Sequence, residues 1–186
     1  MNVQPDLHMD KAAFLAWVEG REGRYELAAG RVLMMTGGSR AHGQITANLF
    51  RALDSRLDPD RWTILSDFGI DLGPKTLRYP DIVVDPAADA PRDLTASAPV
   101  LIAEVLSPST ERVDLGDKAA EYLRLPSLAV YLVLAQDELK AWVWQRGADD
   151  FSPRPEVFTT PDSLIRIAAL GIDLPLAEIY ARVKTS

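Results

Sequence analysis

Short apolar runs rich in β-branched residues recur along the chain, and two of them are bounded by a carboxylate. Asp81 precedes the run of residues 82–84, and Glu104 follows the run of residues 100–103. Runs of this length, flanked by Pro, Asp and Ser, are typical of buried strands. A carboxylate in such a strand is costly to bury unless it is paired or binds a metal. If the two strands are neighbours, both acids lie at one place.

Apolar residues at helical spacing predict four helices. Asp10 and Ser39 stand where N-caps are expected, immediately before the first two helices. The third helix carries Lys118 and Tyr122 one turn apart, which places both side chains on one face. The predicted helices cover residues 11–19, 40–57, 113–125 and 175–183.

Alternating or continuous apolar patterns predict strands between these helices. Gly30 lies in the turn of a hairpin, and residues 85–98, rich in Pro, Ala and Asp, are expected to form a surface loop. One long strand, residues 62–72, contains an irregularity. The other predicted strands cover residues 24–27, 31–35, 82–84, 100–106, 128–135, 140–146, 156–160 and 163–168.

The elements in the middle of the chain follow the order α-β-β-β-α-β. This order predicts an α/β (α+β) fold with a mixed central sheet and helices on its faces. The first helix and hairpin, and the last strands and helix, are additions at the two ends. A length of 186 residues is enough for one sizeable core, so residues 1–186 are predicted to form a single domain.

Composition narrows the functional classes. The absence of cysteine excludes disulfides and zinc–cysteine sites, and the formal net charge of −7 argues against broad electrostatic adhesion to nucleic acid. The first ten residues lack the basic and apolar regions of a signal peptide. No apolar run approaches the roughly 20 residues that span a bilayer. We therefore expect a cytoplasmic protein that does not act on a membrane.

Asp81 and Glu104 are the strongest candidates for chemistry. Magnesium takes oxygen ligands, usually one or two carboxylates with waters and substrate phosphates. A cation held in this way can activate a water molecule and stabilise the charge that develops on a phosphodiester. The alternative is that Asp81 is a turn residue after Pro80 and that Glu104 lies at an exposed strand end.

Three other residues have both a functional and an ordinary interpretation. Glu26 lies in an alternating strand, where a charge usually belongs to a solvated face. His42 lies in the first turn of its helix, where a histidine is usually a surface or capping residue. Lys118 is one of only five lysines among 20 basic residues. A chain that uses mostly arginine is expected to keep a lysine where a compact ammonium is needed. The ordinary interpretation of Lys118 is an exposed i,i+4 pair with Asp114.

Together these residues make the chain resemble the PD-(D/E)XK nuclease superfamily and, within it, the Uma-type restriction endonucleases. The resemblance runs from about Met9 to the last predicted helix. The block from Glu104 to Tyr122 is its most specific part. The residues that carry it are Arg24-Tyr25-Glu26-Leu27, Gly30, Ser39, His42, Tyr79-Pro80-Asp81-Ile82-Val83-Val84, Glu104-Val105-Leu106-Ser107-Pro108-Ser109-Thr110, Asp114-Leu115-Gly116-Asp117-Lys118 and Tyr122.

The resemblance implies a restriction-endonuclease-like core that cuts DNA with a bound divalent metal, Mg²⁺ or in its place Mn²⁺. In the superfamily a lysine follows the acid by two residues, but here that position is Leu106. The resemblance places the lysine on the following helix instead, at Lys118. The roles that it implies are metal binding by Asp81, Glu104 and the carbonyl of Val105, catalysis by Glu26, Asp81, Glu104 and Lys118, and substrate binding by His42, Gln44 and Tyr122.

Other functions fit the same residues. A module that binds nucleic acid or protein without cutting would keep the fold, and a hydrolase of another phosphoester would use the same acids. Trp142 and Trp144 lie on one face of a predicted hairpin strand, where they form either a homodimer interface or part of the core. A measurement of metal binding by calorimetry, followed by a test for cleavage of plasmid and oligonucleotides, distinguishes these functions.

Overall fold

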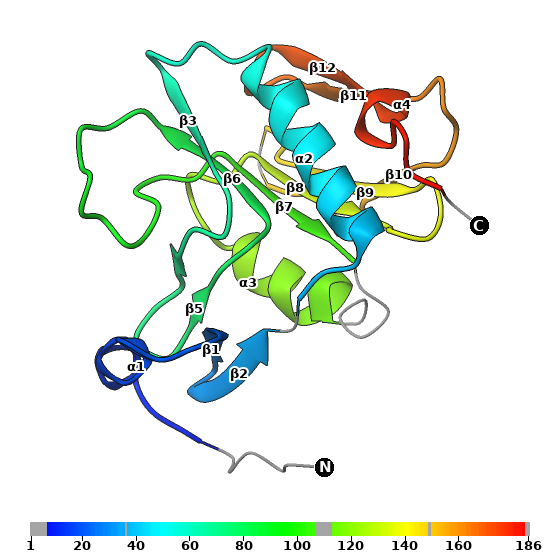
Figure 1. Cartoon of the computed structure of the whole chain (residues 1–186). Coiled ribbons are helices and arrows are strands. Elements are labelled where there is room, and N and C mark those ends of the chain that lie inside the picture. Colours follow the sequence, from blue (N-terminus) through cyan, green and yellow to red (C-terminus); the bar gives the residue numbers. More distant parts are fainter. Residues whose placement is uncertain (1–6, 36, 107–112, 149, 185–186) are drawn as a thin grey trace.

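The protein is described by a computed structural model that covers residues 7–35, 37–106, 113–148 and 150–184 (Figure 1). The segment Ser107-Pro108-Ser109-Thr110, which contributes to the family resemblance, lies outside the described residues. No described helix is long and apolar enough to cross a membrane.

A six-stranded sheet in the order β10-β9-β8-β7-β6-β3 forms the centre of the fold. Only β7 and β8 are parallel neighbours in this sheet, and the other pairs are antiparallel, as the predicted mixed sheet requires. A parallel pair needs a crossover connection, which η1 and α3 supply here. The strands are β3 (Trp62–Leu65), β6 (Ile82–Pro86), β7 (Leu101–Val105), β8 (Val130–Leu134), β9 (Ala141–Gln145) and β10 (Glu156–Phe158).

Alternation along the strands builds a core on each face of this sheet. Ile82 and Ala103 belong to the core beneath α2, together with β11, β12 and α4, whereas Val83 and Ile102 belong to the core beneath η1 and α3 (Figure 1). Glu104 follows Ile102 by two residues and so shares its face. The covering elements are α2 (Arg40–Asp54), η1 (Val113–Lys118), α3 (Ala119–Tyr122), β11 (Leu164–Ile167), β12 (Ile172–Pro175) and α4 (Leu176–Ile179).

A second, four-stranded sheet lies at the end of the central sheet where α3 is found (Figure 1). Its order is β2-β1-β5-β4, and the pairing of Leu27 with Leu77 joins β1 to β5. This register places Glu26 and Arg78 beside each other on neighbouring strands. The elements of this part are α1 (Lys11–Val18), β1 (Arg24–Ala28), β2 (Arg31–Met35), β4 (Ile70–Asp71) and β5 (Leu77–Arg78).

The predicted N-caps are confirmed. The Asp10 side chain accepts a hydrogen bond from the amide of Ala13, and the Ser39 side chain accepts one from the amide of His42. Trp144 is buried and stacks on Tyr131, while Trp142 packs partly buried against the same cluster. The core interpretation of the two tryptophans is thus confirmed. A homodimer stays a prediction.

Several elements differ from the prediction, and two strands, β5 and β12, were not predicted. The strand predicted for residues 62–72 is divided between the two sheets, because Asp67 adopts a positive φ of 53° that no strand residue can adopt. The last helix ends at Ile179 instead of residue 183, and Arg182 has a left-handed φ of 63°. The third helix begins as a π-helix, η1, before it continues as α3.

The loop predicted for residues 85–98 begins late, since β6 extends to Pro86. Asp85 is buried and anchors the end of the loop by accepting hydrogen bonds from the amides of Ser97 and Ala98, each 2.8 Å long, and from the Ser97 hydroxyl at 3.0 Å. The anchor brings residue 98 beside β6, directly before the strand that carries Glu104.

We expect Asp85→Ala to lower the free energy of unfolding by about 2–3 kcal/mol, because it leaves two amides and a hydroxyl without their acceptor. Urea unfolding followed by tryptophan fluorescence measures this change. Asp58→Ala is the matched control, because Asp58 is exposed and accepts one hydrogen bond from the amide of Asp60. Equal losses in the two variants would show that Asp85 is no anchor.

Candidate active site

Asp81 and Glu104 are brought together by the pairing of β6 with β7. Ile82 lies opposite Ala103 in this antiparallel pair, so Asp81 and Glu104 are the next residues on the two strands. The Asp81 carboxylate accepts a hydrogen bond of 2.7 Å from the amide of Val105, which ties it to the other strand. Glu104 is 5% exposed, so the expected alternative of an exposed strand end is wrong.

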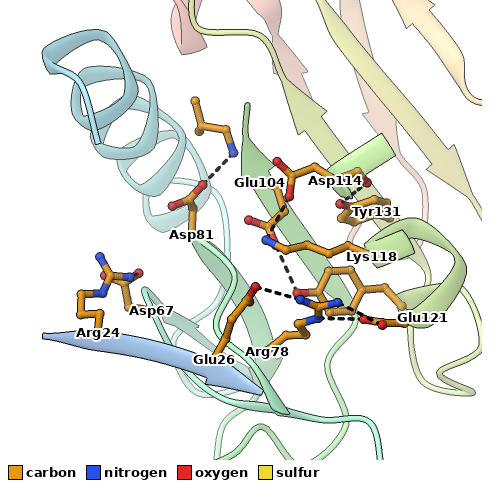
Figure 2. Close-up of polar contacts among 12 residues, drawn as sticks. Arg24, Glu26, Asp67, Arg78, Asp81, Glu104, Asp114, Lys118, Glu121 and Tyr131 are labelled. Carbon is orange, nitrogen blue, oxygen red and sulfur yellow. Dashed lines mark hydrogen bonds and ion pairs between the residues drawn. The ribbon is translucent and has the colours of Figure 1, made fainter. Parts of the chain in front are cut away.

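Glu104 is held by the helical face that the sequence predicts. Lys118 Nζ lies 2.9 Å from Glu104 Oε1, and the Tyr122 hydroxyl donates to the same oxygen at 3.1 Å (Figure 2). Lys118 also lies 3.0 Å from Asp114 Oδ1. The ordinary interpretation of an exposed Lys118–Asp114 pair is wrong, because their side chains are only 8% and 2% exposed. Tyr122 is fully buried, so its hydroxyl positions Glu104.

Asp114 and Lys118 are four residues apart in the π-helix η1 and pair with each other, so both belong to one site. A π-helix has more residues per turn than an α-helix, and it is frequently found at functional sites. The Tyr131 hydroxyl, on β8, donates to the carbonyl of Asp114 at 2.9 Å and fixes the first turn. Both Asp114 and Lys118 consequently face the sheet, and the Glu104 carboxylate lies within reach of the ammonium.

Glu26 belongs to an adjoining buried network. Arg78 donates to Glu26 Oε1 at 2.8 Å and makes two hydrogen bonds, of 2.8 and 3.0 Å, to the carboxylate of Glu121 on α3 (Figure 2). Glu26 is 7% exposed, so the solvated-face interpretation is wrong. Its other oxygen, Oε2, is buried and accepts no hydrogen bond from the described residues. The negative charge of Glu26 also raises the pKa of Lys118, after the larger contributions of Glu104 and Asp114.

Carboxylates outnumber cations in this part of the site. Among the described residues, the two adjoining networks contain four carboxylates and two cations. The carboxylates are those of Glu26, Glu104, Asp114 and Glu121, and the cations are Arg78 and Lys118. Asp81 lies beside them on β6. Burial raises the pKa of Glu104 to about 8, and the charges of Asp114 and Asp81 act in the same direction against Lys118. Burial alone would lower the pKa of Lys118, but the surrounding carboxylates raise it instead. An additional cation would offset this negative charge.

His42 is brought to the site, whereas Gln44 is not. His42 Nε2, in the first turn of α2, lies 3.2 Å from Asp81 Oδ2. The hydrogen bond to Asp81 raises the pKa of His42 although burial opposes the shift. Gln44 donates to Asn48 at 2.8 Å, and Asn48 in turn donates to the carbonyl of Ile179 at the end of α4.

The donor set suits a hard cation that keeps some of its waters. The described residues contain no group of three or more His, Asp or Glu side chains arranged to hold a metal ion. Two carboxylates at adjoining strand positions are nevertheless the usual protein contribution to a magnesium site, where waters and substrate oxygens supply the rest. Asp81 and Glu104 fit this pattern, and the carbonyl of Val105 is the backbone oxygen that follows Glu104.

The comparisons with known proteins cover most of the chain. The model of the family Uma2, described as "Putative restriction endonuclease", matches residues 12–177. An uncharacterized protein of Synechocystis sp. is 31% identical over 142 residues, which is 73% of each chain. A second uncharacterized protein of Synechocystis sp. is 29% identical over 143 residues, or 74% of this chain and 81% of that protein.

A solved structure shows the same fold. The crystal structure of a putative nuclease belonging to DUF820 from Anabaena variabilis superposes with a TM-score of 0.77 at 18% identity, covering 95% of this chain and 99% of that chain. This likeness confirms the predicted nuclease-type fold, with its mixed sheet and flanking helices. With the family model matched from residue 12 to residue 177, the chain belongs to the Uma2 family of restriction-endonuclease-like proteins.

Proposed function

We propose that this protein is a metal-dependent endonuclease that hydrolyses phosphodiester bonds of DNA. The observation that carries the proposal is the placement of Asp81 and Glu104 at adjoining positions of two strands, with the buried ammonium of Lys118 2.9 Å from Glu104. Membership of the Uma2 family supports a nucleic acid as the substrate. The proposed cation is Mg²⁺, which Mn²⁺ can replace.

Asp81, Glu104 and the carbonyl of Val105 would hold the cation. When bound, a divalent cation lowers the pKa of a water ligand and stabilises the negative charge that develops on the phosphate. Lys118 has a second task in this proposal. Once the charge of Glu104 and Asp114 is offset, its ammonium is available to hold the attacking water or a phosphate oxygen.

The remaining residues position the reacting groups. Tyr122 holds Glu104 through Oε1. Arg78 holds Glu26 and ties it to Glu121 on α3, so the second sheet is fixed to the helix that carries Lys118. His42 contacts Asp81 on the side of α2. In the proposed reaction Glu26 acts through Lys118, because the charge of Glu26 raises the pKa of Lys118.

We expect Asp81→Asn to reduce DNA cleavage by about 10²-fold or more and to weaken Mg²⁺ binding, because the proposed site loses one of two anionic ligands. Conversion of supercoiled plasmid in Mg²⁺, Mn²⁺ or EDTA measures cleavage, and calorimetry measures metal binding. Asp71→Asn is the control, because Asp71 pairs with Lys11 at the surface. Metal binding without cleavage of plasmid or oligonucleotides would favour the binding module, and cleavage of a small phosphodiester alone would favour another phosphoesterase.

A smaller loss is expected for Glu26→Gln. The change keeps the shape of the side chain and one hydrogen bond to Arg78, but it removes a negative charge that raises the pKa of Lys118. We expect cleavage to fall by about tenfold, within the range of a single electrostatic contribution. Single-turnover rates measure the change, and circular dichroism verifies folding. Unchanged rates would assign Glu26 to the structural network of Arg78 alone.

A further inference from the structure

A cavity of about 370 Å³ adjoins the candidate site on the side of α2. Asp81 and His42 form part of its wall, and Arg24, Asp67 and Phe50 are among the other residues that line it. In Figure 2, Arg24 and Asp67 face each other on one side of Asp81, and Lys118 lies on the other. The volume falls within the roughly 300–1,000 Å³ that is usual for sites of small molecules and cofactors. A group in this cavity would therefore lie next to Asp81.

Asp67 is held in place at some cost. Its φ of 53° is left-handed, a conformation that non-glycine residues rarely adopt and that is concentrated at functional sites. Its amide donates to the carbonyl of Pro80 at 3.2 Å, directly before Asp81. Its carboxylate pairs with the guanidinium of Arg24 on β1, and both side chains remain about half exposed. The pair thus presents an acceptor and a donor side by side at the cavity.

The charge of the cavity selects the kind of group that it can take. The two basic residues that line it are already paired, Arg24 with Asp67 and His42 with Asp81, so the lining residues offer a phosphate no free cation. A nucleobase is neutral and offers N–H donors to a carboxylate. The ring of Phe50, which packs partly buried against the core, supplies an apolar surface for a flat base.

We propose that this cavity is a subsite for one unstacked nucleobase next to the scissile phosphate. Asp67 and Arg24 form hydrogen bonds with the edge of that base. The position of the phosphate rests on the proposed nuclease function. Guanine matches this pair best. Its N1–H and its amino group can both donate to one carboxylate, and its O6 can accept from the guanidinium. Thymine presents a single N–H between two carbonyls. The subsite consequently favours a single-stranded or locally opened substrate.

The test measures binding without cleavage. Fluorescence anisotropy in EDTA compares a labelled ~12-nucleotide oligothymidine with the same strand carrying one central guanine, and with that guanine base-paired in a duplex. We expect the unpaired guanine to bind about tenfold more tightly than either comparison, the usual discrimination of one bidentate contact. Asp67→Asn, which keeps a residue that tolerates the left-handed φ, should reduce this preference to about threefold or less.

Two further variants complete the test. Arg24→Gln alters the same pair from a different strand and should also reduce the preference, whereas Asp71→Asn, which alters a surface pair with Lys11, should not. Equal binding of all the strands by the parent protein, no binding of any, or a full preference in Asp67→Asn would overturn the subsite. A guanine preference in a protein that cleaves nothing with Mg²⁺ would instead contradict only the proposed nuclease function.

Discussion

Replacing Lys118 with alanine is expected to reduce DNA cleavage by about 10²-fold or more, the usual effect of removing one acid–base or electrostatic group. The ammonium lies 2.9 Å from Glu104 Oε1 and 3.0 Å from Asp114 Oδ1, in a position 8% exposed. Water cannot readily take its place there, and the charge that it supplies to the reacting phosphate is lost. Single-turnover rates with plasmid in Mg²⁺ measure the effect.

The free energy of unfolding of Lys118→Ala, measured with and without Mg²⁺, distinguishes a loss of catalysis from a loss of folding. Without the ammonium, Glu104 and Asp114 are buried without their cation, which typically costs about 3–5 kcal/mol in the free energy of unfolding. We expect Mg²⁺ to restore part of this loss, because a cation bound at Glu104 offsets the same charge. Mg²⁺ affinity should therefore be retained in Lys118→Ala, which calorimetry can verify, and Lys118→Met provides a variant of more similar volume.

Lys118→Arg is expected to rescue little cleavage. The guanidinium of arginine is planar and larger than an ammonium, and its donors are held in a fixed fork, so it cannot occupy the position of the Lys118 ammonium between Glu104 and Asp114. Lys140→Ala is the matched control, because Lys140 makes an ion pair of 3.0 Å with Glu138 at the surface. If Lys118→Ala cleaved DNA at the rate of the parent while its stability fell, Lys118 would be only the structural partner of Glu104 and Asp114.

The pattern of a single strand or helix was sufficient to predict four of the site residues. Asp81 and Glu104 were found because each bounds an apolar run, and an acid in such a run requires a partner. Lys118 and Tyr122 were found because helical spacing places them on one face, and both do reach Glu104. These inferences depend on the periodicity of a single element, which the sequence records directly.

The contacts between the two sheets could not be predicted in the same way. Arg78 was missed although it stands three residues before Asp81, because its partners Glu26 and Glu121 come from a strand and a helix distant in sequence. Only the register of β1 on β5 brings Glu26 beside it. The available signal was the basic residue itself within a strand pattern, since a buried guanidinium requires carboxylates nearby.

Three other differences between prediction and structure concern Gln44, Asp67 and the start of the third helix. Gln44 was expected in the cleft because the family resemblance implied it, but residues two apart on a helix point in different directions and Gln44 donates to Asn48 instead. Asp67, two residues after the end of β3, has a left-handed φ, although aspartate is a common residue in ordinary loops. The π-helical turn that begins at Val113 likewise has no strong sequence signal.

Replacing Arg78 with alanine is expected to lower the free energy of unfolding by about 3–5 kcal/mol, a loss as large as that predicted for Lys118→Ala. The Arg78 side chain is 3% exposed and binds two carboxylates, Glu26 and Glu121. Its removal leaves the buried Glu26 and the partly buried Glu121 without this cation. Because these contacts join the second sheet to α3, the loss should also loosen the position of Lys118. Urea unfolding measures the stability.

Arg56→Ala is the matched control for this prediction. Arg56 also makes two hydrogen bonds to one carboxylate, that of Glu178, but its side chain is 28% exposed and that of Glu178 is 40% exposed. An ion pair at the surface contributes about 0–1 kcal/mol, so this variant should lose little. Arg78→Ala combined with Glu26→Gln should be more stable than Arg78→Ala alone, because one of the two unpaired charges is gone. Similar losses for Arg78→Ala and Arg56→Ala would show that the Arg78 network does not bind the second sheet to the site.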